Sequence, residues 1–255
     1  QWTSHSLLEI KQLELNNLTL TLGNESSDLK INNPLILDQI NEKLITGAAD
    51  LELNEFLSIS SGELSSSGGE IRLSNGLDIS GGKVEFLNSS LLIGPELGSQ
   101  VSLIQSGGSL LADTSYLQLN QNLILQSIEG FSFQSLDLNS RELSLASETS
   151  SLSLKEKLIF DLVSQKIDTG SADLRLEGGI QMSAGEISSS GGTIALSLAA
   201  DNHFQNDAVM ILENTALEPV DPESGSAIMI LDGEPNISLN GGTISFIDLQ
   251  RSKEP

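Results

Sequence analysis

Apolar and polar residues alternate along most of this chain in short bursts. Clear examples are Leu51/Leu53, Leu57/Ile59, Ile71/Leu73, Leu77/Ile79 and Val84/Phe86. Alternation at a period of two predicts half-buried β-strands, and helical spacing is almost nowhere sustained. The bursts begin about every seven residues, which leaves too little chain for ordinary hairpin loops. The pattern therefore predicts an all-β chain of short strands that are not joined as hairpins.

A second regularity is a spacing of twenty residues between equivalent apolar positions. It links Ile31, Leu51, Ile71 and Leu91, then Leu37, Leu57 and Leu77, then Leu64 and Val84, and, further along, Leu154, Leu174 and Ile194. Three short strands in each period predict a single-stranded three-sided β-solenoid (β-helix) with about 20 residues per coil. Each inward residue would stack on its equivalent in the next coil, one strand spacing away.

Glycine pairs separate many of the bursts. They are Gly68-Gly69, Gly81-Gly82, Gly107-Gly108, Gly178-Gly179, Gly191-Gly192 and Gly241-Gly242. Corners of a solenoid need positive φ or a close approach of two backbones, and glycine allows both. We expect these pairs to form the corners.

The chain also repeats itself on a longer scale. Leu13–Ser74 aligns without a gap to Leu136–Ser197, an offset of 136 − 13 = 123 residues. We interpret residues 1–255 as one elongated β-solenoid with an internal repeat, 6–128 and 129–250. Gly76–Phe86 matches Asn236–Phe246 at an offset of 160, so 160 − 123 = 37 residues are inserted near 198–235. This insert should add up to two irregular coils or a protruding flap.

Glycine-pair turns followed by alternating strands, as in SGGEIRLSNGLDISGGKVEF and SAGEISSSGGTIALSL, make the chain resemble filamentous-haemagglutinin-type β-helices. The resemblance implies an exported surface protein of a Gram-negative bacterium, such as an adhesin secreted through an outer-membrane partner. The secretion domain of that family carries Asn-Pro motifs, and Asn33-Pro34 is the single Asn-Pro pair in this sequence. Because one such pair does not match the motifs of the secretion domain, the resemblance implies that the chain is a shaft-like portion of such a protein. It also implies an extracellular or cell-surface location.

The charge balance narrows the range of partners. Thirty-five acidic and 12 basic residues give a net charge of −23. A surface this negative repels nucleic acid and anionic lipid, so we expect neither as a partner. The chain has no cysteine, which excludes disulfides and thiolate metal sites. No apolar run reaches 18 residues, so no transmembrane helix is expected, and Gln1 begins without the features of a signal peptide.

Polar residues of the insert are the candidates for chemistry. His203 stands near Asp201 and Asp207, whereas the other histidine, His5, lies near the amino terminus. A solvated loop is the interpretation that we favour over catalysis. Carboxylate oxygens suit calcium better than a transition metal. Calcium or ligand candidates are Asp201, Asp207, Glu218, Asp221 and Glu223, with Glu213 beside them, and no catalytic or cofactor-binding residue is assigned.

These observations favour a non-catalytic structural or adhesive role as a shaft or filament subunit. Partners would be further copies joined head to tail into fibres, or surface glycans or proteins, because the two ends of a β-solenoid expose strand edges. Two alternatives stay open. One is a β-helix that binds or degrades polysaccharide, which the few, scattered basic residues disfavour. The other is a lipid-conveying β-groove protein of the bacterial envelope, which the glycine-pair corners disfavour.

Overall fold

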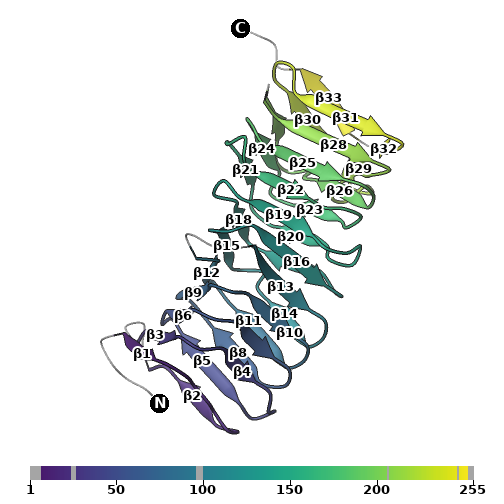
Figure 1. The fold of residues 1–255 in the computed structure, drawn as a ribbon. Coiled ribbons are helices and arrows are strands. Elements are labelled where there is room, and N and C mark those ends of the chain that lie inside the picture. Colours follow the sequence, from purple (N-terminus) through teal and green to yellow (C-terminus); the bar gives the residue numbers. More distant parts are fainter. Residues whose placement is uncertain (1–6, 24–26, 96–99, 206, 246, 252–255) are drawn as a thin grey trace. The chain divides into compact units, whose positions relative to one another are not determined.

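The computed structural model describes residues 7–23, 27–95, 100–205, 207–245 and 247–251. Over these residues the chain is an all-β parallel β-solenoid of about 11 turns with about 22 residues per turn, and it has no helix (Figure 1). The predicted fold class is confirmed. The chain divides into two compact units, Gln1–Gln134 and Ser135–Pro255. This division lies close to the predicted boundary between the repeat copies.

Unit 1 contains three parallel sheets whose strands follow one another in rotation along the chain. The first sheet contains β1 (Leu8–Ile10), β3 (Leu29–Ile31), β6 (Leu51–Leu53), β9 (Glu70–Leu73), β12 (Ser90–Ile93) and β15 (Tyr116–Leu119). The second contains β4 (Leu35–Leu37), β7 (Leu57–Ile59), β10 (Leu77–Ile79), β13 (Val101–Gln105) and β16 (Leu123–Ser127). The third contains β2 (Thr19–Thr21), β5 (Lys43–Gly47), β8 (Glu63–Ser66), β11 (Lys83–Phe86) and β14 (Ser109–Leu111), and β17 (Phe131–Phe133) ends the unit.

Unit 2 is built in the same way, beginning with β18 (Ser135–Asp137). One sheet contains β19 (Glu142–Leu145), β22 (Lys166–Asp168), β25 (Glu186–Ser189), β28 (Val209–Glu213) and β31 (Asn236–Asn240). Another contains β20 (Leu152–Leu154), β23 (Leu174–Leu176), β26 (Thr193–Leu196), β29 (Ala216–Pro219) and β32 (Thr243–Ile244). The last contains β21 (Leu158–Phe160), β24 (Ile180–Met182), β27 (Asn202–Phe204), β30 (Ala227–Leu231) and β33 (Ile247–Arg251).

The core of each unit consists of inward residues stacked in register. Leu51 pairs with Ile71 and Ile71 with Leu91, and all three side chains are buried. In the other unit Leu174 pairs with Ile194 in the same way. Each buried aliphatic side chain contributes about 1.5–3 kcal/mol relative to its exposed state, so the ladders hold the coils together.

Three of the pairs expected from a spacing of twenty residues are wrong. Leu29, not Ile31, pairs with Leu51, and Leu35, not Leu37, pairs with Leu57. In unit 2 Leu152, not Leu154, pairs with Leu174. At each of these places the turn holds 22 residues, because the corners differ in length. A shift of two residues keeps every side chain on its own face, so the pattern of inward residues does not change.

The inserted segment near 198–235 is wound into the coils. It contributes β27, β28, β29 and β30, each paired in parallel with the strand one turn earlier. Met210, Leu217 and Met229 lie at inward positions and are buried. Of the two expectations for this segment, added coils describe the structure and a protruding flap does not.

Glycines at the corners allow the backbones of successive turns to touch. Gly82 has φ +66°, and a Cβ atom built on it would lie 2.3 Å from the carbonyl oxygen of Gly62. Gly108 follows one turn later with φ +60°, and its Cβ would lie 2.5 Å from the backbone of Gly81. No larger residue fits such a stack, which confirms the corner role expected for these glycine pairs.

Candidate functional site: hollows that recur in both units

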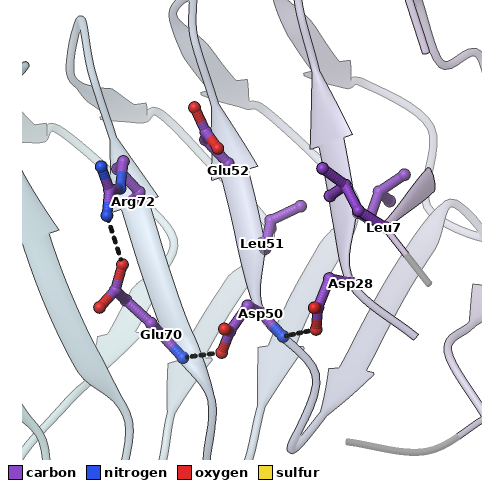
Figure 2. Close-up of a pocket in the computed structure, with 8 residues that line it drawn as sticks. Leu7, Asp28, Asp50, Leu51, Glu52, Glu70 and Arg72 are labelled. Atoms are coloured by element: carbon purple, nitrogen blue, oxygen red, sulfur yellow. Dashed lines mark hydrogen bonds and ion pairs between the residues drawn. The ribbon is translucent and has the colours of Figure 1, made fainter. Parts of the chain in front are cut away.

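A hollow of about 210 Å³ lies where three strands of unit 1 begin, and we call it the ladder hollow (Figure 2). Its lining consists of Leu7, Asp28, Leu29, Asp50, Leu51, Glu52, Glu70 and Arg72. The Asp28 carboxylate accepts the backbone N–H of Asp50 at 3.2 Å, and the Asp50 carboxylate accepts that of Glu70 at 2.7 Å. These carboxylates therefore hold each turn to the next.

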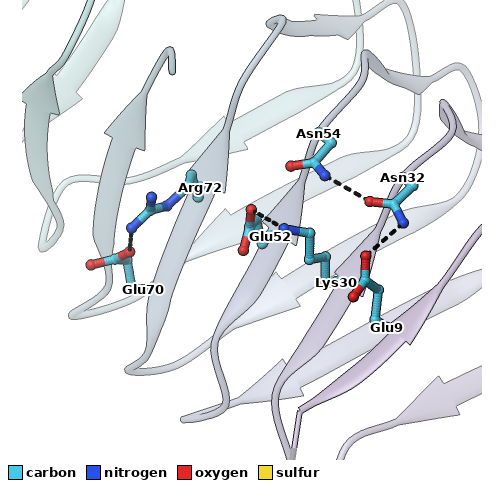
Figure 3. Close-up of polar contacts among 7 residues, drawn as sticks. All are labelled: Glu9, Lys30, Asn32, Glu52, Asn54, Glu70 and Arg72. Carbon is cyan, nitrogen blue, oxygen red and sulfur yellow. Dashed lines mark hydrogen bonds and ion pairs between the residues drawn. The ribbon is translucent and has the colours of Figure 1, made fainter. Parts of the chain in front are cut away.

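Charged and amide side chains continue this network on the outward face of the same strands (Figure 3). Lys30 Nζ lies 2.8 Å from Glu52 Oε1, and Arg72 Nη2 lies 2.8 Å from Glu70 Oε1. Asn54 donates to Asn32 Oδ1 at 2.7 Å, one turn away. The hydrogen bond to Glu52 raises the pKa of Lys30 above its ordinary value, and partial desolvation opposes it. Through these ion pairs and hydrogen bonds, the outward charged and amide groups bind one another within a strand and between turns.

The corresponding hollow of unit 2 measures about 150 Å³ and carries a different set of charges. Its lining is Asp173, Leu174, Arg175, Thr193, Ala195, Glu218 and Val220. Asp173, the counterpart of Asp50, accepts the backbone N–H of Thr193 at 2.7 Å. Thr193 and Ala195 stand where Glu70 and Arg72 stand in unit 1 (193 − 70 = 123). The aspartate that links the turns is retained and the other charges are not, so this hollow is a structural feature of the coil.

A second hollow of unit 1, of about 250 Å³, lies beside β4, and we call it the turn hollow. Its lining is Gln12, Leu13, Glu14, Asn16, Pro34, Ile36, Asp38, Gln39 and Glu42. Ile36 is the middle residue of β4 and points outward, with 55% of its surface exposed. Its neighbour in the next turn is Ser58. The hollow thus combines an exposed aliphatic side chain with carboxylates.

Unit 2 has the same turn hollow, with a volume of about 330 Å³. It is lined by Ser135, Leu136, Asp137, Lys157, Ile159, Asp161 and Gln165. Each of these residues lies 123 positions after a lining residue of the first turn hollow, as in 159 − 36 = 123. Ile159, the middle residue of β21, is 50% exposed. Both turn hollows keep the exposed isoleucine and two acidic positions, Glu14 with Asp137 and Asp38 with Asp161, whereas the ladder hollow keeps one.

A rigid turn borders each turn hollow. In unit 1 the buried carboxylate of Glu42 accepts the backbone N–H groups of Asp38 at 2.9 Å and Gln39 at 3.1 Å. The turn presents Ile40 with 75% of its surface exposed. A carboxylate that accepts two backbone donors fixes the loop conformation in the manner of an Asx turn.

The turn of unit 2 keeps this geometry although glutamine replaces the glutamate. Gln165 Oε1 accepts the N–H groups of Asp161 at 2.7 Å and Leu162 at 2.9 Å. Val163, the counterpart of Ile40, is 81% exposed. The amide oxygen makes the same two hydrogen bonds as the carboxylate, so the shape of the turn does not depend on the charge.

The predicted calcium or ligand candidates lie on different elements of the fold. Asp201 precedes β27, Asp207 precedes β28, and Glu218 lies within β29. Asp221 and Glu223 follow β29, where the Ser224 hydroxyl donates to the Asp221 carboxylate. Winding the insert into coils distributes these residues over different faces. No three His, Asp or Glu side chains of the described residues are grouped so as to hold a metal ion.

The histidine of the insert has a different acidic neighbour from those expected. His203 Nε2 lies 3.7 Å from Asp232 Oδ2, whereas the sequence suggested Asp201 and Asp207. His203 belongs to β27 and pairs with Gln181 and Ile230 of the adjoining strands. His5 lies outside the described residues. Over the part of the chain that is described, no helix is long and apolar enough to cross a membrane.

Comparison of the chain with protein-family models, with curated proteins and with solved structures gave no match.

Proposed function

We propose that this chain is a structural β-solenoid segment, a non-catalytic shaft or filament subunit at a bacterial cell surface, and that copies join end to end. The single observation that carries the proposal is that inward side chains of the last described turn are exposed. There the inward ladder continues, but its side chains are covered on one side only.

Inward side chains are buried in the turn before the last and exposed in the last described turn. Met210, Leu212 and Leu217 are buried in β28 and β29. Their partners one turn later are Ile237, Leu239 and Ile244, of which Leu239 is 39% and Ile244 42% exposed. On the third face Met229 is buried, whereas its partner Leu249 is 58% exposed. A further coil laid on this turn would bury the aliphatic side chains and pair the open edges of β31, β32 and β33.

The first turn of unit 1 offers the complementary edges. Strands β1, β2 and β4 each end their sheet among the described residues, so each carries a free parallel edge. Leu8 and Ile10 of β1 are only partly covered, and Leu18 is largely exposed. The first and last described turns both carry parallel edges with inward aliphatic residues, which is what stacking of one copy on the next requires. This supports self-association head to tail.

The resemblance to filamentous-haemagglutinin-type β-helices supports a surface location and an adhesive use. The glycine corners and parallel coils on which the resemblance rests are present. Buried ladders that fill the inside of each unit favour a mechanical role over an open lipid groove. Repeated polar contacts that tie turn to turn, such as those of Asp50 and Asp173, serve cohesion.

Sedimentation analysis over a range of concentrations, with electron microscopy of the same samples, tests the proposal. We expect end-to-end oligomers that Leu249→Lys abolishes, because it places a charge in the interface. Ile128→Lys is the matched control, since Ile128 is 56% exposed and lies away from the last turn. A chain that stays monomeric, or association that Leu249→Lys leaves intact, would overturn the proposal. Turnover of acidic or neutral polysaccharides would overturn its non-catalytic part.

A further inference from the structure

We propose that the two turn hollows are docking sites, one in each unit, for a protein segment that carries lysine or arginine beside an aliphatic residue. This inference rests on the adhesive role proposed above, and the segment is the partner that the adhesive surface would bind. It differs from self-association, because it concerns outward residues of β4 and β21 and not the exposed inward ladder of the last turn, although β4 is also an edge strand of the first turn.

The first argument is that the chemistry of the turn hollow is repeated. Outward positions of the strands are commonly polar, as Ser58 is beside Ile36. A single exposed aliphatic residue on a surface needs no explanation. Here, however, Ile36 and Ile159 occupy equivalent positions and are exposed to nearly the same extent, 55% and 50%. In the ladder hollow, by contrast, Asp50 alone of the five charged lining residues has a counterpart of the same charge in the lining of unit 2, namely Asp173.

The second argument is preorganisation. Glu42 and Gln165 each fix the neighbouring turn with two hydrogen bonds to backbone N–H groups. The turns hold Ile40 and Val163 out in solvent at 75% and 81% exposure, close in the chain to Ile36 and Ile159. A surface that is rigid before binding loses less conformational entropy when a partner docks. Each hollow therefore presents its exposed isoleucine beside a turn whose backbone is fixed before binding.

The third argument is charge complementarity, which selects the occupant. Glu14 and Asp38 line the hollow of unit 1, and Asp137 and Asp161 line that of unit 2. A second copy of a chain with net charge −23 is a poor match for this rim, as is an anionic lipid surface. A lysine or arginine contributes an aliphatic stem for the isoleucine and a charged head for the carboxylates. An adjacent aliphatic residue would cover the rest of the hollow.

The two hollows differ in one respect that the experiment can use. Lys157 lines the hollow of unit 2 where Pro34 lines that of unit 1. This positive charge should weaken the attraction of a basic segment in unit 2. We therefore expect unit 1 to bind more tightly, and a partner with two such segments to gain avidity from both.

Fluorescence anisotropy with short labelled peptides tests the proposal. The probe alternates lysine and leucine, and two control peptides alternate lysine with serine and glutamate with leucine. We expect the lysine–leucine peptide to bind more tightly than either control. Ile36→Ser combined with Ile159→Ser should weaken it about tenfold or more, because a docked segment would bury the exposed half of each isoleucine. Of the single variants, Ile36→Ser should have the larger effect.

Ile128→Ser is the matched control, since it removes an equally exposed isoleucine elsewhere in unit 1 and should leave binding unchanged. Thermal unfolding of all variants verifies that the exposed substitutions leave the fold intact. Equal binding of the lysine–serine peptide would mean attraction by charge alone and would overturn the proposal. Unchanged binding by the double variant, or tighter binding of the acidic peptide, would overturn it as well. Leu249→Lys should retain peptide binding, which separates this inference from self-association.

Discussion

Lys166 Nζ lies 2.9 Å from Glu186 Oε1 in the next turn of the solenoid. The same pair exists 123 residues earlier, where Lys43 Nζ lies 2.6 Å from Glu63 Oε2. Both pairs join outward residues that face each other across parallel strands, the arrangement in which opposite charges stabilise a sheet. The internal repeat thus preserves contacts between turns, and it does so with the same residue types.

The Lys166–Glu186 pair predicts a pH dependence of stability. The hydrogen bond to Glu186 raises the pKa of Lys166 above the ordinary lysine value of 10.5, against an opposing effect of desolvation. A raised pKa means that the contribution is fully present below pH 10.5 and is lost as the pH rises through the folded-state pKa. Lys166→Met should lower the free energy of unfolding by less than about 1 kcal/mol near neutral pH, because solvent screens the pair.

Urea unfolding of Lys166→Met and of the unaltered chain, at about pH 8 and at several values above pH 10.5, measures this difference. The difference should shrink as the pH rises. Lys11→Met removes an exposed lysine and serves as the control. A difference that grows with pH would contradict the assignment.

Buried hydroxyls that join the turns give a second prediction. Thr215 donates to Ser189 Oγ at 2.9 Å, and Ser189 donates to the backbone carbonyl of Gly191 at 2.7 Å. Ser189→Ala should cost about 1–2 kcal/mol of unfolding free energy, because it removes these hydrogen bonds from a buried site. Ser190→Ala, at the exposed neighbouring position, should change it by less than about 0.5 kcal/mol. Equal effects in thermal unfolding would refute the role of the buried hydroxyl.

The alternation of apolar residues was sufficient to predict the strands, their inward faces and the corners. Leu51, Ile71 and Leu91 stack as expected, whereas Leu29 takes the place expected for Ile31. Two extra residues in the corners of a turn move no side chain to the other face, so periodicity of the apolar residues cannot detect the change at Leu29. The fold is therefore more predictable than its register.

The turn hollows were missed for a different reason. Leu35-Ile36-Leu37 and Leu158-Ile159-Phe160 are continuous apolar runs, and such runs are typical of strands buried on both faces. Only the coordinates reveal that the middle isoleucine is exposed. The alignment of the two runs at an offset of 123 was the available signal. In the acidic insert, residues that are close in sequence are carried to different faces of a coil, so their spacing in sequence does not indicate which of them are neighbours.

The corner glycines give a third prediction, with a matched pair of variants. Gly82 and Gly47 have nearly the same backbone angle, φ +66° and +60°. A Cβ on Gly82 would meet the Gly62 oxygen at 2.3 Å, whereas a Cβ on Gly47 would meet nothing within 4 Å. Gly47→Ala should cost about 1–2 kcal/mol from backbone conformation alone. Gly82→Ala should cost clearly more, as measured by urea unfolding, and equal costs would argue against close packing at the corner.

The inward ladder of the last described turn gives the final prediction. Leu212 and Leu239 are partners on adjacent strands, and they differ in exposure, 1% against 39%. Leu212→Ala should cost about 2–5 kcal/mol, the usual cost of a cavity in a packed core. Leu239→Ala should cost far less in the dissociated chain, because much of that side chain already contacts solvent.

Chemical denaturation at concentrations below and above the onset of self-association separates the two states. If a second copy covers the last turn, the cost of Leu239→Ala should rise toward that of Leu212→Ala once the chain associates, because the interface then buries the leucine. The cost of Leu212→Ala should be the same in both states. A Leu239→Ala effect that ignores concentration would show that oligomers form through another surface, even if Leu249→Lys disrupts them.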